Sequence, residues 1–151
     1  MISRVAISDL KEIFSILKIY DQEFAPPLSS RVNIEEYVEK VFQKGEIYKY
    51  QDGEEEIKGV MFIYINDFIN FSSYLSLLLV QSEFRKSNDK IGEKLLQFWI
   101  ETAKDRNIKS LYLEVGADRE GLVNWYEGYG FSIKEKYNRQ DLASYLMQKT
   151  I

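Results

Sequence analysis

A strand, a polar loop and a helix follow one another over residues 74–96, and this succession limits the possible folds more than any other feature. An apolar run ends at Val80, the loop begins with the basic residues Arg85 and Lys86, and Gly92 opens an amphipathic helix. The N–H groups of such a loop and first helical turn, together with the helix dipole, favour a bound anion. The segment therefore predicts a site for a phosphate or pyrophosphate group.

Hydrophobic periodicity and turn residues predict the other elements. The strand, helix and strand over residues 71–115 imply a parallel pair, and the turn over residues 51–54 implies an antiparallel hairpin. The prediction is a single α/β domain over residues 1–151, with a mixed sheet of about six to seven strands flanked by about four helices. Strands are expected near residues 4–7, 46–50, 57–66, 71–80, 111–115, 131–136 and 144–148, and helices after Asp9, after Asn33, and over 90–105 and 119–128.

Local signals also predict how the first two helices begin and end. Asp9 and Glu12 have the spacing of a capping box at the start of the first helix. Asn33 is the expected N-cap of the second helix, and Gly45 is expected to end it.

The chain contains no cysteine and no histidine. Disulfides, thiolate metal sites and a cysteine nucleophile are therefore excluded, and the commonest general base is missing. Proton transfer must use Asp, Glu, Tyr, Lys, a terminus or water. No metal site is expected, because carboxylates alone rarely hold a transition metal.

Charge and hydropathy exclude further classes of protein. With 20 basic and 24 acidic residues the net charge is −4, which does not suggest a nucleic-acid partner. The longest apolar run, residues 60–65, is too short to cross a bilayer, and the N-terminal segment does not resemble a signal peptide. A cytoplasmic location and no membrane partner are expected. The sequence has no Gly-x-x-x-x-Gly-Lys-Ser/Thr pattern, which excludes a P-loop.

A second motif, WYEGYGF over residues 125–131, lies at the end of the predicted fourth helix. Together with the element order and the segment 74–96, it resembles the GNAT superfamily of acyl-CoA-dependent N-acyltransferases. In that family a tyrosine is followed four and five residues later by Gly and Phe, as Tyr126 is by Gly130 and Phe131. The first motif is similar to the family pattern at Val80, Glu83, Phe84, Arg85, Gly92 and the pair Leu95-Leu96.

The sequence departs from the family pattern in both motifs. The loop over residues 85–92 is two residues longer than in the family. If Gly92 is the second glycine of the family pattern, Lys90 stands where the first glycine is usual. If the alignment instead runs backward from Leu95-Leu96, Ser87 stands in place of Arg85. In the fourth helix, Arg119 and Leu122 stand where the family often has Asn and Ala on the pantetheine side.

The resemblance implies that acetyl-CoA is the acyl donor and that its pyrophosphate binds the loop and first helical turn. A backbone N–H of the fourth strand would polarise the thioester carbonyl, as in an oxyanion hole. The implied cofactor-binding residues are Leu78, Leu79, Val80, Arg85, Lys86, Ser87, Asn88, Lys90, Ile91, Gly92 and Arg119.

The resemblance also implies that Tyr126 is the general acid that protonates the departing thiolate, with Trp125 and Tyr129 as neighbouring competitors. The general base is open between Glu114 on the fifth strand and Asp67 after the third. Because the chain has no cysteine, direct transfer to the amine is favoured over a cysteine intermediate.

Two functions remain open. The first is an acetyl-CoA-dependent N-acetyltransferase that acts on a primary amine of a small molecule or peptide. Tyr74 and Ser76 would face its acceptor, and the segment with Asp21, Glu23 and Phe24 would set specificity. The second is a non-catalytic acyl-CoA-binding or partner-binding module on the same fold, which the altered loop and the missing histidine motivate. The C-terminal edge strand is compatible with a homodimer.

Overall fold

The computed structural model describes residues 1–24, 26–139 and 142–151. This part of the chain contains seven strands and four α-helices. The strands are β1 (Ile2–Arg4), β2 (Glu46–Tyr50), β3 (Gly59–Asp67), β4 (Ser72–Val80), β5 (Ser110–Gly116), β6 (Ser132–Arg139) and β7 (Leu142–Thr150). The helices are α1 (Leu10–Ile19), α2 (Ile34–Lys44), α3 (Ile91–Asp105) and α4 (Glu120–Gly128). The predicted order of elements is confirmed, but the predicted placement of the first strand is wrong: it runs over Ile2–Arg4, so that only Arg4 of the predicted residues 4–7 lies in it.

The strands form one mixed sheet in the order β1-β2-β3-β4-β5-β7-β6. Within it β4 and β5 run parallel, and the other neighbouring strands run antiparallel. Both predicted pairings are confirmed. β4 and β5 form the parallel pair, and β2 and β3, which flank the turn over residues 51–54, form the antiparallel pair. The crossover through α3 places β4 and β5 side by side in the middle of the sheet.

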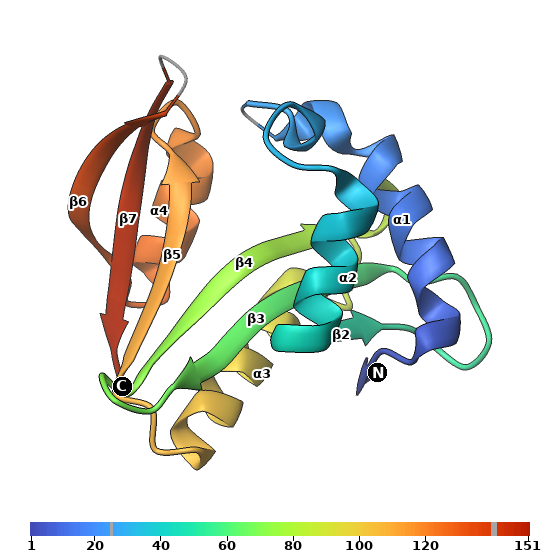
Figure 1. Cartoon of the computed structure of the whole chain (residues 1–151), viewed down its shortest axis with the longest axis horizontal. Helices are drawn as coiled ribbons and strands as arrows, with labels where there is room; N and C mark the ends of the chain where they lie inside the picture. Colours follow the sequence, from blue (N-terminus) through green and yellow to red (C-terminus); the bar gives the residue numbers. More distant parts are fainter. Residues whose placement is uncertain (25, 140–141) are drawn as a thin grey trace.

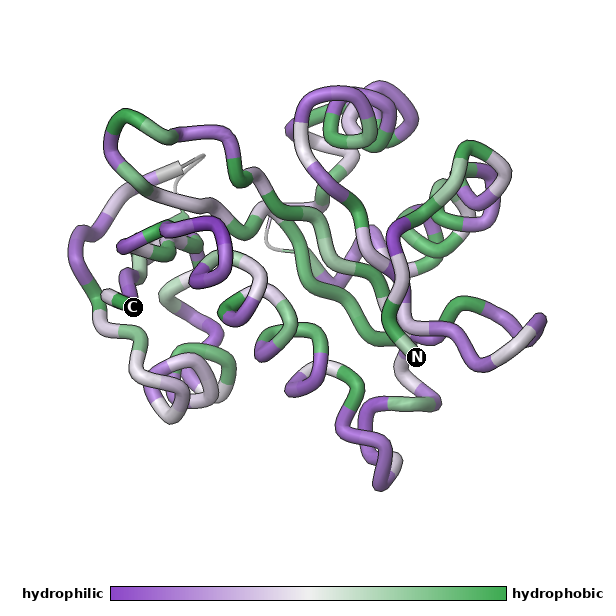
Figure 2. The backbone as a smooth tube through the Cα atoms, turned by 90° about the horizontal axis from the view of Figure 1, so that it is seen from below, coloured by the Kyte–Doolittle hydropathy of each residue, from purple (hydrophilic) through white to green (hydrophobic). Residues whose placement is uncertain are grey.

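Helices cover both faces of the sheet (Figure 1). On one face α1 and α2 pack against β2, β3 and β4 around Leu17, Val38 and Phe62. On the other face α3 packs with β5 and α4 around Trp99 and Leu113. Figure 2 shows the hydrophobic central strands between helices of mixed hydropathy. Each helix therefore buries one apolar side, as its periodicity predicts.

The ends of α2 follow from its capping residues. The Asn33 side-chain oxygen accepts a hydrogen bond from the Glu36 amide at 3.0 Å, which confirms the predicted N-cap. Gly45 follows the helix, and a Cβ atom there would lie 2.6 Å from the carbonyl oxygen of Ile63. The helix ends where the close approach of β3 requires a glycine.

The capping box predicted at Asp9 and Glu12 is wrong. Asp9 accepts a hydrogen bond from the Ala6 amide at 2.8 Å and pairs with Lys49 at 2.9 Å. Glu12 accepts a hydrogen bond from the Ile57 amide at 2.7 Å. Both carboxylates have partners outside α1, and sequence spacing alone cannot distinguish such tertiary partners from local ones.

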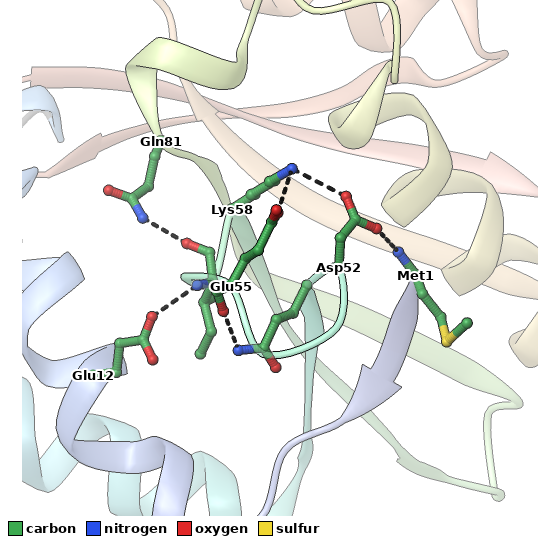
Figure 3. A network of polar contacts seen from close by, with 8 residues as sticks. Met1, Glu12, Asp52, Glu55, Lys58 and Gln81 are labelled. Carbon is green, nitrogen blue, oxygen red and sulfur yellow. Dashed lines mark hydrogen bonds and ion pairs between the residues drawn. The ribbon is translucent and has the colours of Figure 1, made fainter.

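A polar network connects the β2–β3 loop to the amino terminus and to the residue that follows β4 (Figure 3). Lys58 Nζ lies 3.0 Å from Asp52 and 3.3 Å from Glu55, and Asp52 also pairs with the terminal ammonium at 3.1 Å. The Gln81 side chain donates a hydrogen bond to the Ile57 carbonyl. The loop between β4 and α3 is therefore fixed at its first residue.

A second polar cluster surrounds Glu46, which is 7% exposed. Its carboxylate accepts two hydrogen bonds from Arg106 and one from the Tyr48 hydroxyl at 2.7 Å, and Arg4 lies 3.4 Å away. Burial alone would raise the pKa of Glu46, but the hydrogen bonds and charges of these neighbours lower it below its ordinary value. Both carboxylate oxygens have partners within the protein, so the cluster stabilises the fold.

Candidate active site

The centre of the sheet opens where β4 leaves β5. The two strands pair in register from Ser72 with Ser110 to Leu75 with Leu113, and in the described register their pairing ends there. β4 continues to Val80 beside β3 alone. In Figure 1 the two strands diverge from the end at which they are paired. The second half of β4 therefore has backbone groups on its β5 side that the sheet does not use.

A β-bulge lies at the same point of β4. Phe62 pairs with Leu77 and Ile63 with Leu75, which leaves Ser76 as the extra residue. The bulge reverses the alternation of side chains: Leu75 belongs to the core under α3, whereas Leu77 belongs to the core under α1 and α2. At Ser76 the alternate side chains of β4 therefore switch from one core to the other, next to the residue at which the pairing with β5 ends.

A cleft of about 770 Å³ lies at this opening. Its walls are β4 from Tyr74 to Val80, β5 from Leu113 to Gly116, the loop and first turn of α3, part of α4, the first residues of β7 and the segment between α1 and α2. This volume is within the usual range for pockets that bind cofactors and other small ligands.

The α3 helix begins at the cleft. Its first intrahelical hydrogen bond runs from the Lys94 amide to the Lys90 carbonyl at 3.0 Å, so the amides of Ile91, Gly92 and Glu93 have no partner within the helix. All three residues line the cleft. Because the helix dipole adds positive potential at this end, the first turn of α3 can bind an anion.

Lys90 has φ 49°, in the left-handed region that glycine favours. It is the residue that would stand at the first glycine of the GNAT pattern when Gly92 is aligned with the second. Its ammonium group forms no ion pair with the described residues, and Lys90 lines the cleft. The backbone conformation suited to glycine is therefore present, and a positive charge stands beside it.

Arg85 is engaged within the protein. Its Nη2 atom lies 2.7 Å from Glu23 Oε1, and its Nε donates to the Val80 carbonyl at 2.7 Å. The guanidinium also lies 5.4 Å from the centre of the Tyr20 ring. Arg85 therefore connects the loop to the segment between α1 and α2, because its guanidinium forms an ion pair with Glu23.

Tyr126 lines the cleft from α4 and is 5% exposed. Burial raises the pKa of its hydroxyl, for which no hydrogen bond is found among the described residues. The rings of Trp125 and Phe131 lie edge-on to it at 5.0 and 5.7 Å. The competing Tyr129 is not among the lining residues, and burial together with the nearby Glu93 raises the pKa of its hydroxyl. Of the tyrosines at the end of α4 that the sequence suggested, Tyr126 is therefore the one that lines the cleft.

The two carboxylates considered as general bases lie in different places. Glu114 on β5 lines the cleft. Asp67 lies outside its lining, in the turn between β3 and β4, where it accepts hydrogen bonds from the amides of Ile69 and Asn70 at 3.2 and 3.0 Å and from the Ser72 hydroxyl at 3.1 Å. Of these two candidates, Glu114 is the one that could reach a molecule in the cleft.

The structure brings most of the predicted site residues to this one cleft. Those that line it are Leu78, Leu79, Val80, Arg85, Ser87, Lys90, Ile91, Gly92, Glu114, Arg119 and Tyr126, with Glu23, Phe24, Tyr74 and Ser76 from the expected acceptor side. Lys86 and Asn88 are exposed in the loop and do not line the cleft. Asp21 also lies outside its lining and accepts hydrogen bonds from Ser29.

The polar residues of the cleft that the sequence patterns did not indicate include Arg31 and Ser144. Arg31 follows the proline-containing segment after α1, and Ser144 lies near the start of β7. Neither belongs to a motif, and only the tertiary fold brings them to β4 and β5.

Within the described ranges, no group of three or more His, Cys, Asp or Glu side chains is arranged to hold a metal ion. No helix there combines the length and the apolar composition needed to cross a bilayer.

A family model described as an acetyltransferase (GNAT) domain matches residues 17–151. No curated protein matches the sequence. The chain belongs to the GNAT acetyltransferase family, as the resemblance of its two motifs predicted.

Solved structures of this fold superpose on nearly the whole chain. The ribosomal-protein-S18-alanine N-acetyltransferase from Escherichia coli has a TM-score of 0.79 and 18% identity, and the match covers 100% of this chain and 93% of that one. The NatC complex bound to Gag peptide and CoA has a TM-score of 0.79 and 20% identity, with 100% and 98% covered. A GNAT family acetyltransferase from Elizabethkingia anophelis with acetyl-CoA bound has a TM-score of 0.63 and 24% identity, with 77% and 82% covered. These likenesses confirm the fold.

Proposed function

We propose that this GNAT acetyltransferase moves the acetyl group of acetyl-CoA directly to a primary amine of a small molecule or peptide. The observation that carries the proposal is the cleft itself. It joins a helix N-terminus, the open second half of β4 and the unpartnered hydroxyl of Tyr126. Family membership and the CoA or acetyl-CoA named with two of the similar structures support the choice of donor.

The first turn of α3 would bind the pyrophosphate. The amides of Ile91, Gly92 and Glu93 supply hydrogen-bond donors, and Lys90 and Arg119 supply positive charge at the lining of the cleft. A side chain at Gly92 would be in ordinary contact with Val80 and Trp125, so the glycine leaves this end of the cleft wider than any other residue would. Arg85, which pairs with Glu23, would hold the loop in place.

The second half of β4 would align the acyl group. Beyond Leu75 its backbone faces the cleft without pairing to β5, so the residues Leu78, Leu79 and Val80 can offer amide and carbonyl groups to an extended ligand. A backbone N–H directed at the thioester carbonyl would stabilise the negative charge that develops on its oxygen.

Two side chains would move the protons. Glu114 accepts a proton from the acceptor nitrogen, the nitrogen forms the new C–N bond, and the C–S bond breaks. Tyr126 then donates its proton to the departing thiolate and regains one from solvent, while Glu114 releases its proton to solvent. The high pKa of Tyr126 keeps it protonated at neutral pH. A chain without cysteine has no thiol on which a cysteine acyl-enzyme could form.

Peptides are the acceptors to be tested first. Two of the similar structures are named for an N-acetyltransferase of a protein alanine and for a complex with a peptide. The acidic net charge of −4 is compatible with a cationic acceptor. A cytoplasmic location, a possible homodimer, and the absence of nucleic-acid and membrane partners remain parts of this proposal.

A thermal-shift titration with acetyl-CoA tests the donor. A ligand that binds the folded state alone at about 100 times its Kd adds about 2.7 kcal/mol of stability. The melting temperature should therefore rise with acetyl-CoA concentration in both the wild type and Tyr126→Phe. If millimolar acetyl-CoA gives no shift, the proposal is wrong.

A second candidate is a non-catalytic acyl-CoA-binding or partner-binding module on the same fold. Two observations favour it: the pairing of Arg85 with Glu23, and a lysine at the position of the family's first glycine. Binding of acetyl-CoA without thiol release over a broad amine panel would support this candidate, whereas turnover that collapses in Tyr126→Phe would exclude it.

A further inference from the structure

Ser144 has a buried hydroxyl without a hydrogen bond. The residue is 9% exposed, and its Oγ atom has no partner in the part of the chain that the structure describes. A buried hydroxyl without a partner is unfavourable, because it has lost its bonds to water and gained none in return. An alanine would avoid this cost, so the hydroxyl requires an explanation beyond packing.

The register of β5 and β7 places this hydroxyl beside Glu114. Gly116 pairs with Ser144, and Glu114 pairs with Leu146. Residues two apart on a strand share a face, as do residues directly opposite each other. Ser144 and Glu114 are therefore diagonal neighbours on one face of the sheet, and both line the cleft. Gly116 has no side chain that could cover the hydroxyl from the opposite strand.

A neutral primary amine matches this pair of groups. It has two N–H donors and one lone pair, whereas a neutral secondary amine has a single N–H. One N–H can be directed to the Glu114 carboxylate and the other to Ser144 Oγ, which leaves the lone pair for the thioester carbonyl. The bound amine would supply the hydrogen bond that Ser144 lacks in the free protein.

We infer that Ser144 binds the nitrogen of the acceptor and selects primary amines over secondary ones. The inference rests on the proposed function and extends it to a residue outside both sequence motifs. Ser144 contacts the acceptor and takes no part in binding the donor, so its loss should affect the acceptor alone.

Ser73 provides a matched control in the same sheet. It is 2% exposed, accepts a hydrogen bond from Trp99 Nε1 at 2.9 Å and donates one to the Tyr64 carbonyl at 2.7 Å. It is not among the residues that line the cleft. Ser73→Ala removes a hydroxyl that is fully bonded within the protein, whereas Ser144→Ala removes one that is not.

The experiment compares the full-length wild type with both variants. A tetra-alanine peptide, spermidine and kanamycin are screened by thiol release from acetyl-CoA, and the best acceptor is used together with its N-methylated form. For Ser144→Ala we expect the KM of the primary amine to rise about 2- to 10-fold, as for loss of a hydrogen bond between neutral groups. The KM of acetyl-CoA should stay unchanged, and the preference over the N-methylated amine should fall.

Thermal melting provides a readout independent of turnover. Ser144→Ala should melt at or above the temperature of the wild type, and Ser73→Ala should melt below it with an unchanged preference between the two amines. The inference is overturned if Ser144→Ala melts as low as Ser73→Ala, or if it keeps the wild-type KM for the amine. If the wild type itself releases no thiol with any acceptor, the proposed function fails and the inference falls with it.

Discussion

The Glu46 cluster and the cleft both contain buried polar groups, but they differ in whether those groups have hydrogen-bond partners within the protein. Around Glu46 the carboxylate oxygens are bonded to Arg106 and Tyr48. In the cleft the hydroxyls of Tyr126 and Ser144 have no partner among the described residues. Because most buried polar groups in native proteins are bonded, unpaired ones indicate where a ligand completes the structure. Substitutions in the first region should therefore change stability, and substitutions in the second should change function.

The largest expected effect is that of Tyr126→Phe. Loss of a positioned general acid should lower turnover about 100- to 10,000-fold. Because the hydroxyl has no partner in the free protein, the melting temperature and the affinity for acetyl-CoA should stay close to the wild type. Steady-state thiol release, a melting curve and a binding titration check the three parts.

Tyr129→Phe is the control for that change. Tyr129 is near Tyr126 on the chain, but it does not line the cleft. It should lose a little stability and keep most of its turnover. Equal losses of turnover in the two variants would contradict the role of Tyr126.

Glu46→Gln tests the other region. Loss of the charge beside Arg106 should lower the free energy of unfolding by about 2 kcal/mol, measured by urea denaturation at neutral pH. The exposed pair of Lys18 and Glu35 provides the control, because Glu35→Gln should change stability by less than about 0.5 kcal/mol. Turnover should stay close to wild type in both variants.

The same variant has a predicted pH dependence. The pKa of Glu46 lies below its ordinary value of 4.5 in the folded state, so its stabilisation is complete above that pH. The stabilisation should be lost as the pH falls further, through the lowered folded-state pKa. The difference in stability between the wild type and Glu46→Gln should therefore shrink on acidification. A difference that stays constant down to pH about 2 would contradict the lowered pKa.

The smallest effect concerns Lys90. Lys90→Gly should raise the free energy of unfolding by about 0.5 to 1 kcal/mol, because glycine adopts the left-handed conformation without strain. Asn107 has φ 64°, and asparagine tolerates this region, so Asn107→Gly should change stability less. Loss of the lysine charge should also weaken acetyl-CoA binding at low salt, and a titration of both variants at two ionic strengths checks this.

The order of elements could be predicted because each helix and strand has its own periodicity or turn signal. The bulge at Ser76 could not, because the residues that follow it, Leu77 to Val80, are all apolar. A continuous apolar run does not indicate which side chain faces which core. The opening between β4 and β5 is a consequence of tertiary pairing and has no local signal.

The candidate site was predicted where it coincides with motifs. The first turn of α3, Tyr126 and Glu114 lie in the cleft as expected. The pairing of Arg85 with Glu23 joins residues 62 positions apart, so the loop sequence alone suggested a charge free for phosphate. Ser144 was missed because a lone serine in a strand has no distinguishing spacing.

The most direct test of acetyl transfer is amine-dependent release of CoA thiol from acetyl-CoA, with the acceptor analysed by mass spectrometry. Direct transfer predicts one free thiol for each amine that gains an acetyl group, and a rate that collapses in Tyr126→Phe. Acetyl-CoA that binds and raises the melting temperature, but releases thiol no faster with any amine than without one, would contradict it.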